Sequence, residues 1–524
     1  MNSEDSLVFT RKTSGLVKGL GWKDIFIIVI SAPAGSGILY YSVSTASAYP
    51  GGNIGISFLI GLTLFLPVIY LAALSASMIP RSGSLYVLIS RTVNPSMGFL
   101  ASGLFFIGYT LSVGVVAFIV TKVVGGILVN YGLAGGIELL KTMGAALQMP
   151  FWSTIGGCIL VLLTWVIVLR GVSVFKNTMR ILFYLPMAAI LIAIVFFCVS
   201  GFESTAKSFN STWGANKFEQ IIALANQYGW TRSPFSWNST FNLLLVVLFS
   251  YGGLELISYA SGEITKQQKK NIRAYLLAGL SLGVIYTSIA FSVTHAYGDF
   301  LGAYDYVFNN HNAELSKIMT PIAPSIPFYI SSLIPNPWIG ILISVSISLW
   351  LVNTMIPYFF APSRIIFALA MDRVLPDSMA DVSVKTGAPT KASHLTLLFA
   401  LCGVFFTLFN VGTVLGTILF CALFVYWLYG ASAMSLPYNN PLIYEQCPIK
   451  RTFFRIPVLT WLGALVFAIG WLVIFISVKQ MTYDIAIVLS CIMAGLMVYF
   501  FYRQHKIKGK QIDSKMIFDQ LPPE

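Results

Sequence analysis

The residues of this chain whose types and spacing could bind a small molecule lie inside an apolar segment, 24–48. At its middle stands the stretch Ser31-Ala-Pro-Ala-Gly-Ser-Gly-Ile38, in which Pro33 has no backbone N–H and the glycines add backbone freedom. In a membrane, unpaired peptide groups are costly, so a helix is broken only where the gap lines a cavity or is buried in protein. We interpret this stretch as half of a binding site; the alternative is that its glycines only allow close helix packing.

A second interruption, Phe249-Ser-Tyr-Gly-Gly-Leu-Glu255, lies in the apolar segment 239–262. Membrane proteins built from inverted repeats form a midplane site from two discontinuous helices in corresponding positions. These two segments are the first and the sixth of the chain, so we expect both stretches to unwind and to lie against each other. The residues expected to bind substrate here are Pro33, Ala34, Gly35, Ser36, Gly37, Phe249, Ser250, Gly252 and Gly253.

The chemistry offered by two such breaks suits a zwitterion. A helix N-terminus presents free N–H groups and partial positive charge, so the helical part that begins near Gly35 suits a carboxylate. The open carbonyls where each helix stops suit an ammonium group, and an α-amino acid carries both charges on one carbon. No Asp, Arg or Lys lies in the expected pocket segments, which favours a neutral or apolar side chain.

Glu255 is the clearest ionisable residue within an apolar segment. Such a residue is a functional candidate because its charged form is costly in hydrocarbon. The alternative is that it accepts hydrogen bonds from orphan amides at the break, and the two roles are compatible. Glu263, eight residues on, is expected at a solvated membrane boundary.

Composition places the chain among polytopic membrane proteins. Of 524 residues, 57% are hydrophobic and 10% are charged, and the mean hydropathy is +0.80, whereas soluble domains carry about 25% charged residues. The formal net charge of +13 sits in short loops and forms no basic stripe, so we expect no nucleic-acid partner. Six cysteines without CxxC spacing indicate neither a disulfide framework nor a metal site.

Apolar runs of about 20 residues are long enough to cross a bilayer. Twelve are predicted, at 24–48, 53–78, 96–121, 151–169, 178–201, 239–262, 274–298, 337–371, 394–411, 413–436, 456–478 and 483–503. We expect an all-α membrane protein divided into a tail (1–23), a five-helix unit (24–201), a loop (202–238), a second five-helix unit (239–436), two further helices (437–503) and a second tail (504–524).

The distribution of positive charge predicts the orientation. With the N-terminus inside, 25 of the 32 Lys and Arg residues fall on the cytoplasmic side, which places both termini in the cytoplasm of a cell (plasma) membrane protein. The outer stretch 299–336 mixes prolines with apolar residues and could fold as a short helical lid over an external entrance.

Two inner loops add further motifs. Pro80-Arg-Ser-Gly-Ser-Leu-Tyr86 follows the second segment, and Arg364-Ile-Ile-Phe-Ala-Leu-Ala-Met-Asp-Arg-Val-Leu-Pro376 closes the eighth. Together with the two interrupted segments, in this order on twelve spans, they resemble the amino acid-polyamine-organocation (APC) transporters over residues 24–505. That resemblance implies a core of two inverted five-helix repeats with discontinuous first and sixth helices, plus two peripheral helices.

The resemblance also implies roles for individual residues. Ser36 and Gly37 match carboxylate contacts, and the carbonyls of Pro33, Phe249 and Gly252 match amine contacts. The remaining matches concern the pocket and its gate: the ring of Phe249 covers the substrate, Tyr109 and Tyr358 line the pocket, and Glu255 takes part in proton-dependent gating.

The expected function is secondary active transport of amino acids by alternating access, with no cofactor and no enzymatic chemistry. The fifth segment lacks the lysine that replaces a sodium ion in some family members, which puts that proton mechanism in doubt. Ser344, Ser346, Ser348 and Asn353 could offer oxygen ligands to sodium, but proton coupling or exchange is favoured. The alternatives are a polyamine or organic-cation carrier and, in another class, a non-transporting membrane nutrient sensor.

Overall fold

The computed structural model describes residues 9–334, 336–409, 416–418, 420–421, 424–479, 481–508 and 514–523. Its longer helices are α2 (Trp22–Ser36), α3 (Ile54–Met78), α5 (Pro95–Ala134), α7 (Pro150–Leu169), α8 (Val172–Val199), α13 (Gln268–Tyr297), α17 (Pro337–Met371), α18 (Thr390–Phe406), α20 (Val425–Asn439), α22 (Val458–Lys479) and α23 (Tyr483–Lys508). The shorter elements are the π-helix η1 (Gly37–Tyr41), α4 (Ser84–Thr92), α6 (Glu138–Gln148), α9 (Phe202–Trp213), α10 (Lys217–Gln227), α11 (Trp237–Asn242), α12 (Leu244–Tyr251), the 3₁₀-helices η2 (Leu256–Tyr259), η3 (Ser261–Glu263) and η4 (Asp377–Ala380), α14 (Phe300–Asn310), α15 (Asn312–Ile318), α16 (Ile326–Ser331), α21 (Pro441–Tyr444), α24 (Ser514–Asp519) and the strands β1 (Thr452–Phe453) and β2 (Ile456–Pro457).

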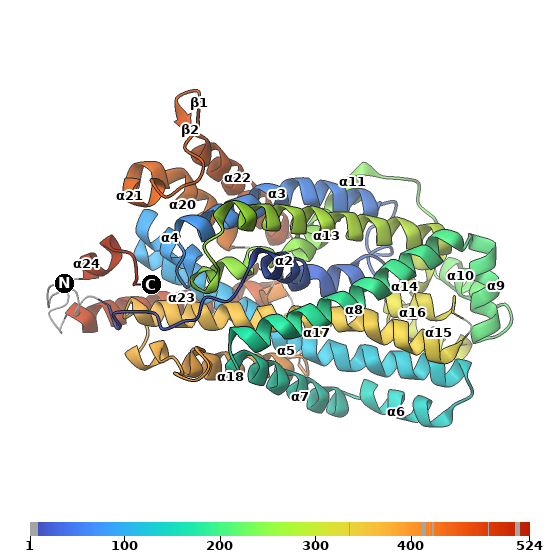
Figure 1. Ribbon diagram of the computed structural model, residues 1–524. Coiled ribbons are helices and arrows are strands. Elements are labelled where there is room, and N and C mark those ends of the chain that lie inside the picture. Colours follow the sequence, from blue (N-terminus) through green and yellow to red (C-terminus); the bar gives the residue numbers. More distant parts are fainter. Residues whose placement is uncertain are drawn as a thin grey trace.

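Within these residues the chain is a helical bundle whose long helices run roughly along one axis (Figure 1). The segment before α2 and the C-terminal α24 lie at one end of the bundle, which we call the tail end. Helices α9, α10, α14 and α15 lie at the opposite end, which we call the far end. The two-residue strands β1 and β2 pair antiparallel in a hairpin at the edge of the bundle.

Nine helical segments of the described residues are long and apolar enough to cross a membrane, which makes this a mostly helical, multi-pass membrane protein. They are Ile54–Met78, Pro95–Leu133, Pro150–Leu169, Val172–Val199, Trp237–Tyr259, Gln268–Tyr297, Pro337–Met371, Val458–Val478 and Tyr483–Lys508. Of the other expected spans, 24–48 contains α2 and η1 up to Tyr41, and the described part of 394–411 is helical in α18 up to Phe406. The expected span 413–436 falls partly outside the described residues.

Asparagine caps start three of these long helices. The side chain of Asn53 accepts the N–H of Ile56 at the start of α3. Asn94 and Asn336 cap α5 and α17 in the same way, and a proline follows each of them at the first helical position. Proline suits that position because its missing N–H would be unpaired there in any helix.

Helix α17 is central to the packing that positions the interrupted segments. It packs against α2, α5 and α8, while α13 packs against α2 and α3. At the far end the stretch 299–336 forms α14, α15 and α16, so the prediction of short helices there is confirmed. The Tyr304 hydroxyl donates to the carbonyl of Ile322 (2.6 Å) and ties α14 to the segment before α16.

Candidate functional site

The first interrupted stretch is helical, so the prediction that it unwinds is wrong. Residues 31–36 belong to α2, and the helix changes to a π-helix at Gly37. The hydroxyl of Thr354 lies within the hydrogen-bond ladder, where it accepts the N–H of Gly35 (3.1 Å) and donates to the carbonyl of Ser31 (3.0 Å). A polar side chain from a neighbouring helix thus pairs the backbone groups at the break, which removes the need to unwind.

The change to a π-helix occurs one turn after Pro33. The N–H of Gly37 donates to the carbonyl of Ala34, and the Pro33 carbonyl accepts the Tyr286 hydroxyl instead (2.8 Å). The amides of Gly35 and Gly37 therefore both have acceptors within the protein, contrary to the expectation of bare amides. Ser36 ends α2, and its side chain lies outside what the structure describes.

The second interrupted stretch does leave the helix, so this break is confirmed. Helix α12 ends at Tyr251, residues 252–255 form turns, and η2 starts at Leu256. Gly253 has a φ of 107°, a backbone conformation that side-chain-bearing residues rarely adopt. Gly253 is what lets the chain turn here, whereas Gly252, with a φ of −61°, has an ordinary extended backbone.

Tyr286 of α13 brings the two stretches together. Its hydroxyl lies 2.7 Å from the carbonyl of Ser250 and 2.8 Å from that of Pro33. With one proton, this hydroxyl is shared between the two carbonyls, so each keeps acceptor capacity for another donor. The expected adjacency of the two stretches is confirmed, and the surface at their junction is rich in carbonyl groups.

Glu255 lies beside this junction and is 1% exposed. Its Oε1 accepts hydrogen bonds from the hydroxyls of Tyr109 (3.1 Å) and Tyr426 (3.0 Å). Its Oε2 accepts the N–H of Gly253 (3.2 Å), an amide freed by the break. The carboxylate therefore holds the turn in place and joins it to α5 and α20.

Aromatic rings flank the junction on two sides. The rings of Phe249 and Tyr41 meet edge to face at 6.0 Å, and those of Tyr109 and Tyr358 at 4.8 Å. The Tyr358 hydroxyl also donates to the carbonyl of Gly252 (3.3 Å). The structure thus gathers the candidate residues of α2, α5, α12 and α17 around one place.

Sequence reasoning missed Thr354, Tyr286 and Tyr426. Each donates a hydroxyl hydrogen bond to the interrupted stretches or to Glu255. A usable signal existed, because a tyrosine within an apolar span needs a hydrogen-bond partner when it is buried. That signal identifies the need for a partner and leaves its identity open.

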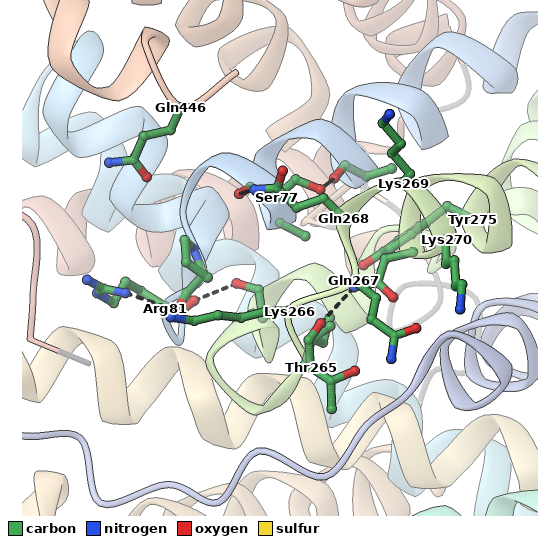
Figure 2. Close-up of a pocket in the computed structure, with 16 residues that line it drawn as sticks. Ser77, Arg81, Thr265, Lys266, Gln267, Gln268, Lys269, Lys270, Tyr275 and Gln446 are labelled. Atoms are coloured by element: carbon green, nitrogen blue, oxygen red, sulfur yellow. Dashed lines mark hydrogen bonds between the residues drawn. The ribbon is translucent and has the colours of Figure 1, made fainter. Parts of the chain in front are cut away.

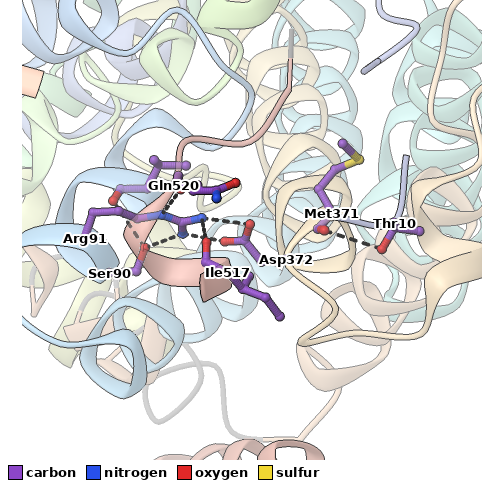
Figure 3. A network of polar contacts seen from close by, with 8 residues as sticks. Thr10, Ser90, Arg91, Met371, Asp372, Ile517 and Gln520 are labelled. Carbon is purple, nitrogen blue, oxygen red and sulfur yellow. Dashed lines mark hydrogen bonds and ion pairs between the residues drawn. The ribbon is translucent and has the colours of Figure 1, made fainter. Parts of the chain in front are cut away.

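Buried polar contacts join several segments at the tail end. The guanidinium of Arg91 forms an ion pair with Asp372, with Nη2 2.9 Å from Oδ1, and also donates to the carbonyls of Ile517 and Gln520 (Figure 3). The hydroxyl of Thr10 donates to the carbonyl of Ala370 (2.7 Å). Segments near both ends of the chain therefore hold the end of α17.

Glu263 also forms a buried contact at this end, and its expected solvated position is wrong. It is fully buried, and its Oε1 accepts Arg364 Nε at 2.6 Å. Its carbonyl accepts the N–H groups of Gly19 and Leu20, both at 3.0 Å. The segment before α2 is thereby joined to the end of the second interrupted helix.

At the far end, Asp305 of α14 holds the segment that follows η1. Its carboxylate accepts the N–H of Ser47 (3.0 Å), the hydroxyl of Ser47 and the side-chain amide of Asn309 (2.9 Å). Burial raises the pKa of Asp305, and these hydrogen bonds oppose that rise. The chain leaving the first interrupted stretch is therefore anchored to the far-end helices.

We expect Gly37→Ala to lower uptake by about fivefold or more, since overpacking costs roughly 1–3 kcal/mol. A Cβ at this position would lie 2.4 Å from Cζ of Tyr286, so the ring would have to leave the carbonyls of Pro33 and Ser250. Uptake into proteoliposomes measures this. Gly495→Ala is the matched control, because its Cβ would meet nothing within 4 Å and uptake should stay at the wild-type level. Unchanged uptake by Gly37→Ala would contradict the contact.

Comparison with known proteins adds independent evidence. Residues 20–498 match the family model described as amino acid permease. The chain is 22% identical over 494 residues to the methylthioribose transporter of Bacillus subtilis (strain 168), covering 91% of this chain and 96% of that protein. It is 22% identical over 407 residues to the branched-chain amino acid permease BcaP of the same organism, covering 74% of this chain and 75% of that protein.

Proposed function

This chain belongs to the amino acid permease family, a transporter family of the APC superfamily, and from that premise we propose that it moves amino acids across the membrane by alternating access. Its relatives are transporters, and the chain is a transporter and not an enzyme. The observation that carries the proposal is the Tyr286 hydroxyl between the carbonyls of Pro33 and Ser250, which places two interrupted membrane segments in contact.

The proposed substrate site lies at this junction. The carbonyls of Pro33, Phe249 and Gly252 are the proposed contacts of the ammonium group, because a cation can use their remaining lone pairs. The Ser250 carbonyl, which shares the Tyr286 hydroxyl with that of Pro33, is a further candidate. Phe249, with Tyr41 against it, is the proposed cover over the bound molecule. The carboxylate is proposed to bind where η1 begins at Gly37, after Ala34 and Ser36. In this proposal the N–H groups of Gly35 and Gly37 give up their present acceptors when substrate binds.

In this proposal the core comprises two inverted five-helix repeats, 24–201 and 239–436, among twelve spans. The excess of Lys and Arg at the tail end supports cytoplasmic termini, and we propose a plasma membrane location. The polar contacts at the tail end would then keep the cytoplasmic side closed while the far end admits substrate. The helices of 299–336 are the proposed lid.

Glu255 is the proposed coupling group. The carboxylate now accepts hydrogen bonds from Tyr109 and Tyr426. Once protonated, the carboxyl group would donate one hydrogen bond, and this change would alter the turn at Gly253 that it holds. Proton coupling or exchange is favoured over sodium.

A polyamine or organic-cation carrier is the second candidate, and one observation favours it. The amides of Gly35 and Gly37 have acceptors within the protein, so the junction offers more carbonyl groups than free N–H groups. A cation without a carboxylate would suit that balance.

Uptake of labelled amino acids into proteoliposomes, with imposed proton or sodium gradients, tests these proposals. We expect saturable uptake of a neutral amino acid that the free amino acid inhibits and its amide does not. Equal inhibition by the amide or by a polyamine would favour the cation carrier. Binding of an amino acid without any uptake or exchange would contradict transport and favour a sensor.

A further inference from the structure

We propose that a recess at the tail end, separate from the transport site, binds the phosphate group of an anionic ligand. The recess has a volume of about 650 Å³ and lies between the end of α3, the segment before α4 and the start of α13 (Figure 2). The lining includes Ser77 of α3, Arg81 of the segment before α4 and Gln446 of the segment after α21.

Positive charge is the main feature of the recess. Lys266, Lys269 and Lys270 line it together with Arg81, and its lining residues include no Asp or Glu. The three lysines are exposed, and in the described part of the chain none of them forms an ion pair with a carboxylate. Three cations that share one recess without a protein counter-ion suit an anion bearing more than one oxygen, and phosphate is such a group.

The backbone and neutral side chains reinforce this preference. Helix α13, 30 residues long, starts at Gln268 in the recess, so its first N–H groups and its dipole favour an anion there. Asn271 lines the recess and is 8% exposed; its side-chain amide donates to the carbonyl of Thr265, while its Oδ1 has no partner among the described residues. An unpaired buried acceptor beside the cations suits a hydroxyl next to the phosphate, as in a glycerol or inositol phosphate ester.

Basic residues at one end of a membrane protein can simply set its orientation. Three other basic residues lie in and just before the hairpin, as many as the lysines of the recess, and they are outside its lining: Lys450, Arg451 and Arg455. They offer a matched comparison, because an equal loss of charge from the hairpin leaves the recess intact. If the recess binds an anionic ligand, removing charge from the recess weakens that binding, whereas removing the same charge from the hairpin does not.

The test is the thermal unfolding midpoint of the purified full-length protein, titrated with dioctanoyl phosphatidylglycerol, dioctanoyl phosphatidylcholine or glycerol phosphate. We expect phosphatidylglycerol to raise the midpoint of the wild type and of Lys450→Gln/Arg451→Gln/Arg455→Gln. In Lys266→Gln/Lys269→Gln/Lys270→Gln the apparent affinity should fall by at least about tenfold, since each basic residue contributes to attraction of an anionic headgroup. Lys269→Gln alone is a milder variant that should show a smaller loss in the same direction.

The titrations also separate the source of the phosphate. A response to phosphatidylglycerol alone identifies a lipid headgroup, and a response to glycerol phosphate as well identifies a site open to soluble esters. Equal responses of the two triple variants, or a response to phosphatidylcholine as strong as that to phosphatidylglycerol, would overturn the proposal. The readout is binding, so it stands apart from the outcome of the uptake experiments.

Discussion

Glu255→Leu should abolish transport, whereas Glu255→Gln should bind substrate and lose its response to a proton gradient. Leucine leaves the hydroxyls of Tyr109 and Tyr426 and the N–H of Gly253 without their acceptor. Each unsatisfied buried group costs about 1–3 kcal/mol, so the turn that faces the proposed site should lose its fixed geometry. Glutamine keeps a carbonyl oxygen for Gly253, and its amide can donate to a tyrosine oxygen as a protonated carboxyl would.

Two measurements on the same variants check this expectation. Binding of a transported amino acid, followed by the shift in thermal unfolding midpoint, should persist in Glu255→Gln and fall by at least about tenfold in Glu255→Leu. Uptake by Glu255→Gln should be equal with and without an imposed pH gradient. Tyr426→Phe is the control, since it removes one donor and keeps the carboxylate, so uptake should still follow the gradient. Gradient-driven uptake by Glu255→Gln would assign Glu255 a purely structural role.

The two interrupted stretches show what local sequence can predict about a membrane helix. In the second stretch Gly253 supplies the freedom to turn and Glu255 supplies an acceptor for a freed amide. All of these lie within four residues of one another, so the sequence pattern predicts the break correctly. The chemistry needed to leave the helix is local.

The first stretch looked equally broken, but the groups that repair it come from elsewhere in the chain. Thr354 is 319 residues from Gly35, and Tyr286 is 253 residues from Pro33. Proline and glycine indicate that backbone bonds are missing, while the side chains that replace them depend on how α13 and α17 pack. Local sequence therefore predicts correctly that backbone hydrogen bonds are missing, and predicts wrongly that the helix unwinds there.

The ends of the helices follow the same rule. The expected start of the eighth segment at 337 matches α17 because Asn336 and Pro337 form a local cap, and its expected end at 371 matches as well. The third segment was expected to end at 121, yet α5 continues to Ala134. No local stop signal lies at 121, and α6 packs against the added turns. Hydrophobicity predicts where a helix can cross a membrane, and packing decides how far it continues.

Glu263 is the clearest case of a distant partner. As a carboxylate beside four basic residues, it has the local sequence of a solvated loop. Its partner, Arg364, is 101 residues away, and both side chains are fully buried. The guanidinium also lies 3.6 Å from the centre of the Phe360 ring. This pair joins the end of the second interrupted helix to α17, so its loss should have a large effect.

Arg364→Met should lower the free energy of unfolding by about 3–5 kcal/mol, because it leaves the buried carboxylate of Glu263 without a counter-ion. Glu263→Met should cost a similar amount by leaving the guanidinium unpaired. The double variant Glu263→Met/Arg364→Met should recover most of the loss, since apolar side chains of similar volume often replace a buried ion pair at little cost. Part of the loss should remain, because the double variant also lacks the contact between Arg364 and Phe360.

Denaturant-induced unfolding of the purified variants in mixed micelles measures this cycle, and the coupling between the two sites is the quantity of interest. Lys317→Met is the control, because its ion pair with Glu314 is largely exposed and should contribute nothing measurable. Losses in the two single variants that simply add in the double variant would show that the pair is not coupled. Strong coupling would instead mean that the closed tail end depends on this contact, and that any opening there must keep the pair together or hydrate both charges.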